Sequence, residues 1–488
     1  MLLPAACASG SKAAPTPAVG TATTAAAPAL DLPVAPSQED WRTARPASST
    51  PADPALPTFS KERLPNGVTL LVSEVRSLPI VSFALVVRGG SALDPAGQGG
   101  LTALAFAMLD EGAGGRDALA FSDAVADLGA SISAGASQDS GTLAISGLSR
   151  NAGAMLALLA EAALAPRLDA KDFERVKKLT LASLARQKSS AEGIAFERVP
   201  ALIYGPNHPY GHPANGTEAT VGGLSLAQLK SHLKKLLVPG EATLVAVGNI
   251  DAKEAKTLAL EHLGRWRGGP APKLAIPSLE APPRKGIVLV DQPGANQTMI
   301  VVGRPVFGRS HPAEMPMLLT NEVFGGSFAS RLNMNLREDK GYTYGAHSAA
   351  SLRRGVGAFY AMAKVRADVT GASLKEFFGE LGNLTARPPS SDEIERARAG
   401  LVGSLPGEFE RTGAIASAAS SLFVYDLPLD YFSAYTARVE QVTSEQIGAI
   451  IQAYLQPDRM QILLVGDGSV VRPQLEALGL GAVTVQKP

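Results

Sequence analysis

The chain has 488 residues and carries 45 Lys and Arg against 45 Asp and Glu, so its formal net charge is zero. This balance gives neither a basic surface nor an acidic tail, and we therefore expect no nucleic-acid partner. The length exceeds what a single ordinary core contains, which predicts two or more domains. No apolar run reaches the roughly 18 residues that a membrane-spanning helix needs.

The first 57 residues differ in composition from the rest of the chain. Residues 8–57 are rich in Ala, Pro, Thr and Ser, which predicts a disordered tether because such a segment cannot bury enough apolar surface to order itself. The single cysteine, Cys7, follows Ala5 and Ala6. Small residues before a lone cysteine resemble the cleavage site of a bacterial lipoprotein, although the basic segment and most of the apolar stretch of such a signal are missing.

Lipidation of Cys7 would attach the chain to a membrane. We therefore expect a protein of the bacterial cell envelope, either in the periplasm or held as a lipoprotein. The alternative is an ordinary free thiol on a flexible tail, which requires no membrane.

The folded part opens with strands and continues with helices. A turn at 64–67 precedes a strand that reaches residue 72, and further strands are expected at 80–87, 130–134, 142–146 and 243–248. Helices are expected at 101–109, 121–128, 151–164, 170–189 and 226–237, with Asp169 or a neighbour as the cap of the fourth helix. Runs of strands followed by runs of helices favour an α+β fold, with one mainly antiparallel sheet and helices on one face.

A second copy of this plan follows the first at a nearly constant offset. Gly67 corresponds to Gly286, an offset of 286 − 67 = 219, and Pro239 corresponds to Pro457, an offset of 457 − 239 = 218. The segment LSLAQL at 224–229 corresponds to VTSEQI at 442–447, an offset of 442 − 224 = 218. We therefore predict two homologous tandem domains, at 58–268 and 286–488, joined by a proline-rich linker at 269–285.

The most apolar helix of the first domain is the one expected at 101–109. Nearly every residue in it is apolar, and glycines flank it at Gly99, Gly100 and Gly112. A helix without a polar face is normally a core helix.

Several motifs together resemble the pitrilysin/insulinase family of zinc metallopeptidases, over nearly all of residues 58–488. The motifs are LPNG at 64–67, HPYG at 208–211 with GT at 216–217, and LREDKGYTY at 336–344, which is similar to the L-R-E-x-x-G-x-x-Y motif of the family's C-terminal half. The resemblance implies two homologous halves that close like a clamshell around a cavity, with the helix at 101–109 in the place of the zinc-binding helix.

The donor atoms of that zinc site are absent. The family's H-x-x-E-H falls on Ala103, Phe106 and Ala107, and its third ligand, a Glu in a later helix, falls on Ser183. Methyl and phenyl groups offer no donor atom, and a hydroxyl is a poor zinc ligand. We therefore expect no metal and no water-activating residue in this chain, and the resemblance implies that a partner subunit holds the zinc.

The six histidines do not supply a substitute. His208 and His212 are four residues apart, but Pro209 and Gly211 between them prevent a helical turn, so we expect a turn fixed by hydrogen bonds. The others are scattered and are interpreted as solvated or core residues: His232, His262, His311 and His347.

The second half keeps the residues that the resemblance assigns to substrate binding. Arg337 and Tyr344 match the Arg and Tyr that active members of the family place across the cavity from the zinc. Several N–H donors and one hydroxyl, aimed at a peptide carbonyl, would stabilise an oxyanion. The alternative is that Arg337 pairs with Glu338, Asp339 or another acid, and that Tyr344 is a core strand residue.

With the zinc positions lost and the Arg and Tyr kept, the resemblance implies the non-catalytic subunit of a heterodimeric zinc endopeptidase, because some bacterial members of the family divide these two parts between two chains. Its partner would be a homologous chain with an intact H-x-x-E-H, and its substrates would be unfolded peptides. The alternative is a structural or scaffolding homologue without a proteolytic role. An active stand-alone peptidase would require zinc ligands from an unanticipated place.

Overall fold

A computed structural model describes residues 56–270, 272, 274–279 and 286–488. Cys7, most of the predicted tether at 1–57 and part of the predicted linker at 269–285 lie outside the described residues. Within the described part, no helix is both long enough and apolar enough to cross a membrane.

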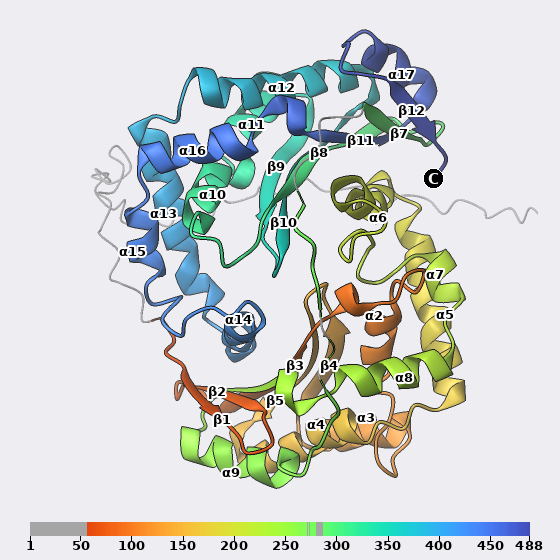
Figure 1. Cartoon of the computed structure of the whole chain (residues 1–488), viewed down its shortest axis with the longest axis vertical. Coiled ribbons are helices and arrows are strands. Elements are labelled where there is room, and N and C mark those ends of the chain that lie inside the picture. The colour runs from red at the N-terminus through yellow and green to blue at the C-terminus, as the bar shows by residue number, and fades with distance from the viewer. Residues whose placement is uncertain (1–55, 271, 273, 280–285) are drawn as a thin grey trace, which may run out of the picture. The chain divides into compact units, whose positions relative to one another are not determined.

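Two mixed sheets of six strands each form the framework of the described part (Figure 1). The first sheet has the order β1-β2-β6-β3-β5-β4. Its strands are β1 (Ser60–Arg63), β2 (Thr69–Glu74), β3 (Ile80–Arg88), β4 (Ser131–Ala136), β5 (Ser140–Leu148) and β6 (Ala242–Gly248). The second sheet has the order β12-β7-β11-β8-β10-β9. Its strands are β7 (Ile287–Asp291), β8 (Gln297–Phe307), β9 (Thr343–Ser351), β10 (Val356–Arg366), β11 (Gln461–Gly466) and β12 (Val483–Gln486).

Both sheets are mainly antiparallel. Among the described strands, β2 pairs with β6 in parallel, and β7 pairs in parallel with both β11 and β12. The other neighbouring strands of both sheets run antiparallel.

Helices follow the strands in each half. The first half contains α2 (Leu101–Phe106), α3 (Ala118–Asp127), α4 (Ala152–Leu164), α5 (Ala170–Gln187), α6 (Ala191–Tyr204), α7 (Glu218–Gly222), α8 (Leu226–Leu236) and α9 (Ala252–Leu263). The second half contains α10 (Glu314–Asn321), α11 (Arg331–Asn333), α12 (Thr370–Ala386), α13 (Ser391–Glu408), α14 (Thr412–Val424), α15 (Tyr435–Glu440), α16 (Ser444–Tyr454) and α17 (Gly468–Glu476). Two π-helical turns, Glu322–Gly326 and Met334–Asp339, flank α11.

The predicted fold class and its internal repeat are confirmed. The strand order β2-β6-β3-β5-β4 of the first sheet recurs as β7-β11-β8-β10-β9 in the second. Helices α8 and α16 have 11 residues each and begin 444 − 226 = 218 positions apart. Each opens with a capping box, Ser225 with Gln228 and Thr443 with Gln446, which satisfies two backbone N–H groups at the helix start.

One predicted helix cap is confirmed, and one predicted helix is shorter than expected. Asp169 caps α5 as predicted, because its carboxylate accepts a hydrogen bond from the Lys171 N–H. The helix expected at 101–109 is shorter in the structure and ends at Phe106. The residues that follow, Met108 and Leu109, remain fully buried in a turn, and the chain then forms a β-bridge between Ala113 and Pro166.

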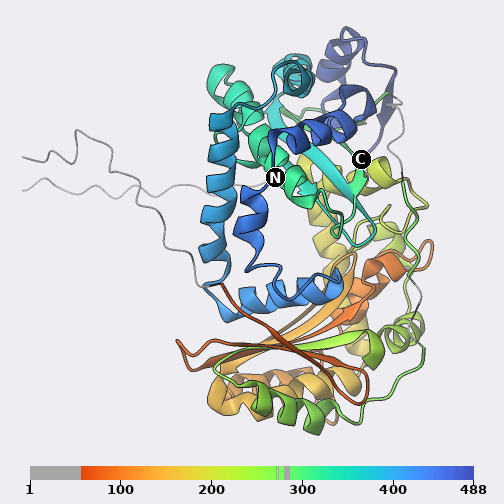
Figure 2. The same ribbon diagram turned by 60° about the vertical axis from the view of Figure 1, so that its left-hand side comes forward.

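Each sheet also receives a helix from the other half on the face opposite its own helices. Helix α14 packs its Ile415, Ala419 and Phe423 against the first sheet at Leu71 and Val86. Helix α6 packs against the second sheet in the same manner. Figure 2 shows the first sheet between its own helices, coloured yellow to green, and the blue α14. This exchange links the two halves in a way that the sequence pattern did not indicate.

Candidate functional site

Helix α2 is held at its N-terminus by a buried polar network. Gly100, the N-cap, has a φ of 91°, and a Cβ there would lie 2.6 Å from the Asn215 carbonyl oxygen, so only glycine fits. The Asp94 carboxylate accepts hydrogen bonds from the N–H groups of Gly100 and Thr102, each at 2.8 Å. The Thr102 hydroxyl lies 2.7 Å from Nε2 of His232. The network satisfies orphan donors of the helix start and sets the direction of α2.

The sequence did not reveal this network, and His232 was expected only among the solvated or core histidines. His232 is 7 % exposed, and its contact with Thr102 spans 130 residues of sequence. An acidic residue shortly before a glycine-led helix was the one available signal, because such residues often cap a helix start.

The predicted zinc positions contain no metal ligands, and one of them belongs to the hydrophobic core. Ala103 is half-buried on α2, Ala107 is half-buried directly after it, and Ser183 is half-buried on α5, which contacts α2. Phe106 is 1 % exposed and belongs to the core of the first half. Its ring lies against β5, since a Cβ added at Gly141 would be 2.1 Å from Phe106 Cζ.

These residues do not fit a zinc ion. Among the described residues there is no group of three His, Cys, Asp or Glu side chains that could hold a metal. The position that the resemblance assigns to the general base is therefore occupied by a packed ring, and a carboxylate there would lose that packing.

Arg337 lies in the second π-helical turn, in front of β9. Its Nε is 3.2 Å from the Glu338 carboxylate, and its guanidinium lies 4.6 Å from the centre of the Phe328 ring. The Arg337 side chain is 41 % exposed, and an ion pair in such a position contributes little stability. The pairing with Glu338 matches the alternative interpretation, but the guanidinium remains accessible.

Tyr344 is the second residue of β9, an edge strand of the second sheet, and is 92 % exposed. The alternative that Tyr344 is a core strand residue is therefore wrong. No contact that the structure records joins Arg337 and Tyr344 directly. Arg337 and Tyr344 lie on adjacent segments, because the chain turns between them at Gly341. The φ of Gly341 is 63°.

Asn333 ties together the segments on both sides of Arg337. It is 4 % exposed. Its amide donates to the Phe328 carbonyl at 2.7 Å, and its side-chain oxygen accepts from the Ala346 N–H of β9 at 3.0 Å. The role of Asn333 is not visible in the sequence, because its partners are defined only once β9 folds back onto the π-helical turn.

The histidine pair behaves as expected for a turn fixed by hydrogen bonds. Nδ1 of His208 accepts from the Tyr210 N–H at 3.0 Å, and Nδ1 of His212 lies 3.0 Å from the Pro213 carbonyl. Burial lowers the pKa of His208. Each ring nitrogen involved already has a partner within the turn.

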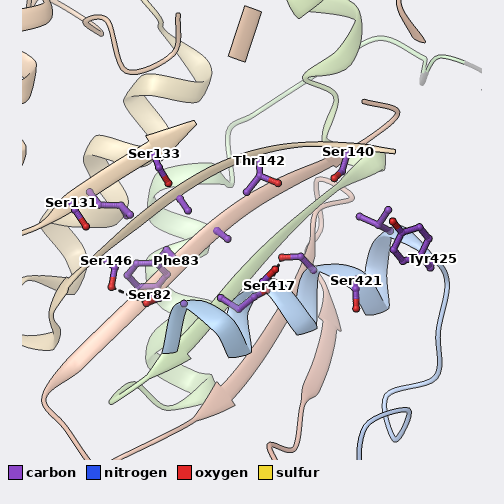
Figure 3. A pocket seen from close by; sticks show the side chains of 17 residues that line it. Ser82, Phe83, Ser131, Ser133, Ser140, Thr142, Ser146, Ser417, Ser421 and Tyr425 are labelled. Carbon is purple, nitrogen blue, oxygen red and sulfur yellow. Dashed lines mark hydrogen bonds between the residues drawn. The ribbon is translucent and has the colours of Figure 1, made fainter. Parts of the chain in front are cut away.

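A cavity of about 440 Å³ lies between the first sheet and α14 (Figure 3). Most of its lining residues carry a hydroxyl group, among them Ser131 and Ser133 on β4, Thr142 on β5, and Ser417 and Ser421 on α14. No charged residue of the described chain lines it. Such a surface can donate and accept hydrogen bonds from neutral polar groups, for example the amides of a peptide.

Comparison with known families identifies the chain. The sequence model described as Insulinase (Peptidase family M16) matches residues 70–217, and the one described as Peptidase M16 inactive domain matches residues 223–401. The chain belongs to the insulinase family. The family resemblance of the motifs is therefore confirmed.

Among the relatives of this chain, some are named as zinc proteases and one is named as a non-peptidase homologue. An uncharacterized zinc protease of Mycobacterium bovis is 26 % identical over 367 residues, which cover 73 % of this chain and 81 % of the relative. The non-peptidase homolog YmxG of Helicobacter pylori is 21 % identical over 409 residues, which cover 82 % of this chain and 92 % of the relative.

A solved structure extends the likeness to the fold. The crystal structure of a peptidase M16 inactive domain from Pseudomonas fluorescens superimposes with a TM-score of 0.79 at 27 % identity, covering 84 % of this chain and 98 % of that one. In this insulinase-family chain, the side chains of Ala103, Phe106 and Ala107 offer no donor atoms. This is consistent with a non-catalytic role.

Proposed function

We propose that the chain is the non-catalytic subunit of a heterodimeric zinc endopeptidase. A homologous partner chain with an intact H-x-x-E-H would hold the zinc and activate the water. This chain would supply Arg337 and Tyr344 as donors to the carbonyl of an unfolded peptide substrate. Attachment through a lipidated Cys7 would place the complex in the bacterial cell envelope.

One contrast within the chain supports the proposal above all. The position of the general base is filled by the buried ring of Phe106, whereas Tyr344 is 92 % exposed on a sheet edge. Packing does not explain this position, because an aromatic side chain that is so exposed contributes nothing to the core. A phenol hydroxyl and a guanidinium in solvent-facing positions can serve a substrate held between two subunits.

The proposal is tested by producing this chain together with an H-x-x-E-H homologue from the same genome. The purified complex should contain one zinc per pair of chains and cleave unfolded peptides in a chelator-sensitive way. Arg337→Ala and Tyr344→Phe should each lower kcat about 10²–10³-fold, the usual effect of removing one oxyanion donor. Both variants should leave the subunits associated in size-exclusion chromatography.

The matched control is Arg472→Ala, because Arg472 is an exposed arginine on α17 that pairs with Glu476. It should retain wild-type kcat. If this chain alone binds stoichiometric zinc and cleaves peptides, the proposal is wrong.

A scaffolding role is the second candidate, and the ion pair between Arg337 and Glu338 favours it. In that case the complex would keep its activity when Arg337 and Tyr344 are both replaced. Loss of activity in these variants with an intact dimer therefore separates the two functions.

A further inference from the structure

A cavity of about 660 Å³ lies in the second half, at the end of β8. Its walls come from the strand β8 and the loop after it, from Tyr454 at the end of α16, and from Ser278 and Leu279. Small-molecule sites in proteins typically have volumes of about 300–1,000 Å³, so the cavity is large enough for a ligand.

Arg304 lines this cavity without a carboxylate partner. It is 7 % exposed, and its Nε makes one long hydrogen bond, of 3.4 Å, to the Pro305 carbonyl. Its Nη1 is buried and has no hydrogen-bond partner. The structure records no ion pair between Arg304 and any acidic side chain of the described residues.

The charges around Arg304 leave it uncompensated. Burial and, to a smaller extent, the positive charge of Arg459 lower the pKa of Arg304, and Asp458 opposes this effect. Asp458 is itself 4.0 Å from Arg459, which also lines the cavity. A buried guanidinium next to a second cation is costly unless an anion joins them.

Three aromatic side chains also line the cavity. The rings of Phe307 and His311 stack with their centres 4.1 Å apart, and Tyr454 meets Phe307 edge-on at 5.1 Å. The Arg304 guanidinium lies 5.6 Å from the centre of the Tyr454 ring. This contact with the ring face stabilises the cation, but it leaves the N–H donors of Arg304 unused.

We infer that the cavity binds a small organic oxyanion. A carboxylate or phosphate group pairs with Arg304, whose planar guanidinium suits two-point binding of either group. A flat apolar part of the ligand lies against Phe307 and Tyr454. The site belongs to β8 and α16 and is independent of Arg337, Tyr344 and the proposed peptidase role.

The test uses the full chain with two probes, inorganic phosphate and benzoylglycine. Both carry an oxyanion, and only the second adds an aromatic ring. Each probe should raise the thermal unfolding midpoint saturably, and isothermal titration calorimetry should give one site, with tighter binding of benzoylglycine. In Arg304→Met the affinity for both probes should fall at least about tenfold, because a hydrogen-bonded charge pair is lost.

Arg472→Met is the matched control and should bind both probes like the wild type. Without a probe, Arg304→Met should unfold at the same temperature as the wild type or higher, because an apolar side chain replaces an unpaired cation. If Arg304→Met does not fold, Arg304→Lys takes its place, with weaker binding expected from the loss of the planar fork.

Two results would overturn the inference. The first is no saturable response of the wild type to either probe, and the second is equal binding by Arg304→Met.

Discussion

Replacement of Phe106 by glutamate, the residue of the family's catalytic motif, should destabilise the first half strongly. Phe106 is 1 % exposed, and its ring fills the space above Gly141 on β5. Removing a buried phenyl ring typically costs about 3–5 kcal/mol. A buried carboxylate without a partner adds about 1–3 kcal/mol or more.

The expected loss of about 4–8 kcal/mol is comparable with the whole stability of a typical domain, about 5–15 kcal/mol. The ionised form is disfavoured by burial, so the pKa of the new carboxyl group should be raised. The variant is then most stable when this carboxyl group is protonated and loses stability as pH rises. The difference in free energy of unfolding between wild type and variant should therefore widen between about pH 4 and pH 8.

Urea unfolding followed by tryptophan fluorescence measures this effect. Trp266 belongs to the same core cluster as Phe106, and a Trp41→Phe background removes the only other tryptophan. Ala107→His is the control, because position 107 is half-buried directly after the same helix, and it should lower the midpoint much less. A Phe106→Glu variant with the wild-type midpoint would refute the account of the lost site.

Three further predictions concern packing and charge. Gly141→Ala should cost about 1–3 kcal/mol by overpacking, and a double-mutant cycle should show that Phe106→Ala removes this cost; additive effects would contradict the contact. Ala419→Glu places a charge between α14 and the first sheet, and hydrogen exchange should rise in both; a rise confined to α14 would contradict the packing. Arg331 holds Glu393 through two hydrogen bonds of 2.6 and 2.8 Å and lowers the pKa of Glu393 from 4.5 to about 2. The stabilisation by the ionised Glu393 is complete above the ordinary pKa of the group and is lost as pH falls. The difference in thermal midpoint between wild type and Glu393→Gln should therefore become smaller from pH 4.5 toward about 2. A difference that stays constant with pH would contradict this.

The sequence alone determined the two-fold repeat, the α+β class and the absence of zinc ligands on α2. The fold class and the missing ligands depend on residues only a few positions apart, and the repeat appears when such local patterns are compared about 218 positions apart. The caps Asp169, Ser225 and Thr443 act within the first turn of their own helices, and hydrophobic periodicity is likewise local. The identity of a side chain also decides directly whether it has a donor atom.

Only the tertiary structure decided which distant groups meet. The exchange of α6 and α14 between the sheets, the contact of Thr102 with His232 across 130 residues and the unpaired state of Arg304 all depend on segments brought together by folding. The sequence does not show whether an acidic side chain pairs with a given arginine in the folded protein. Partners of this kind are set by the packing of whole sheets and helices, which local propensity does not encode.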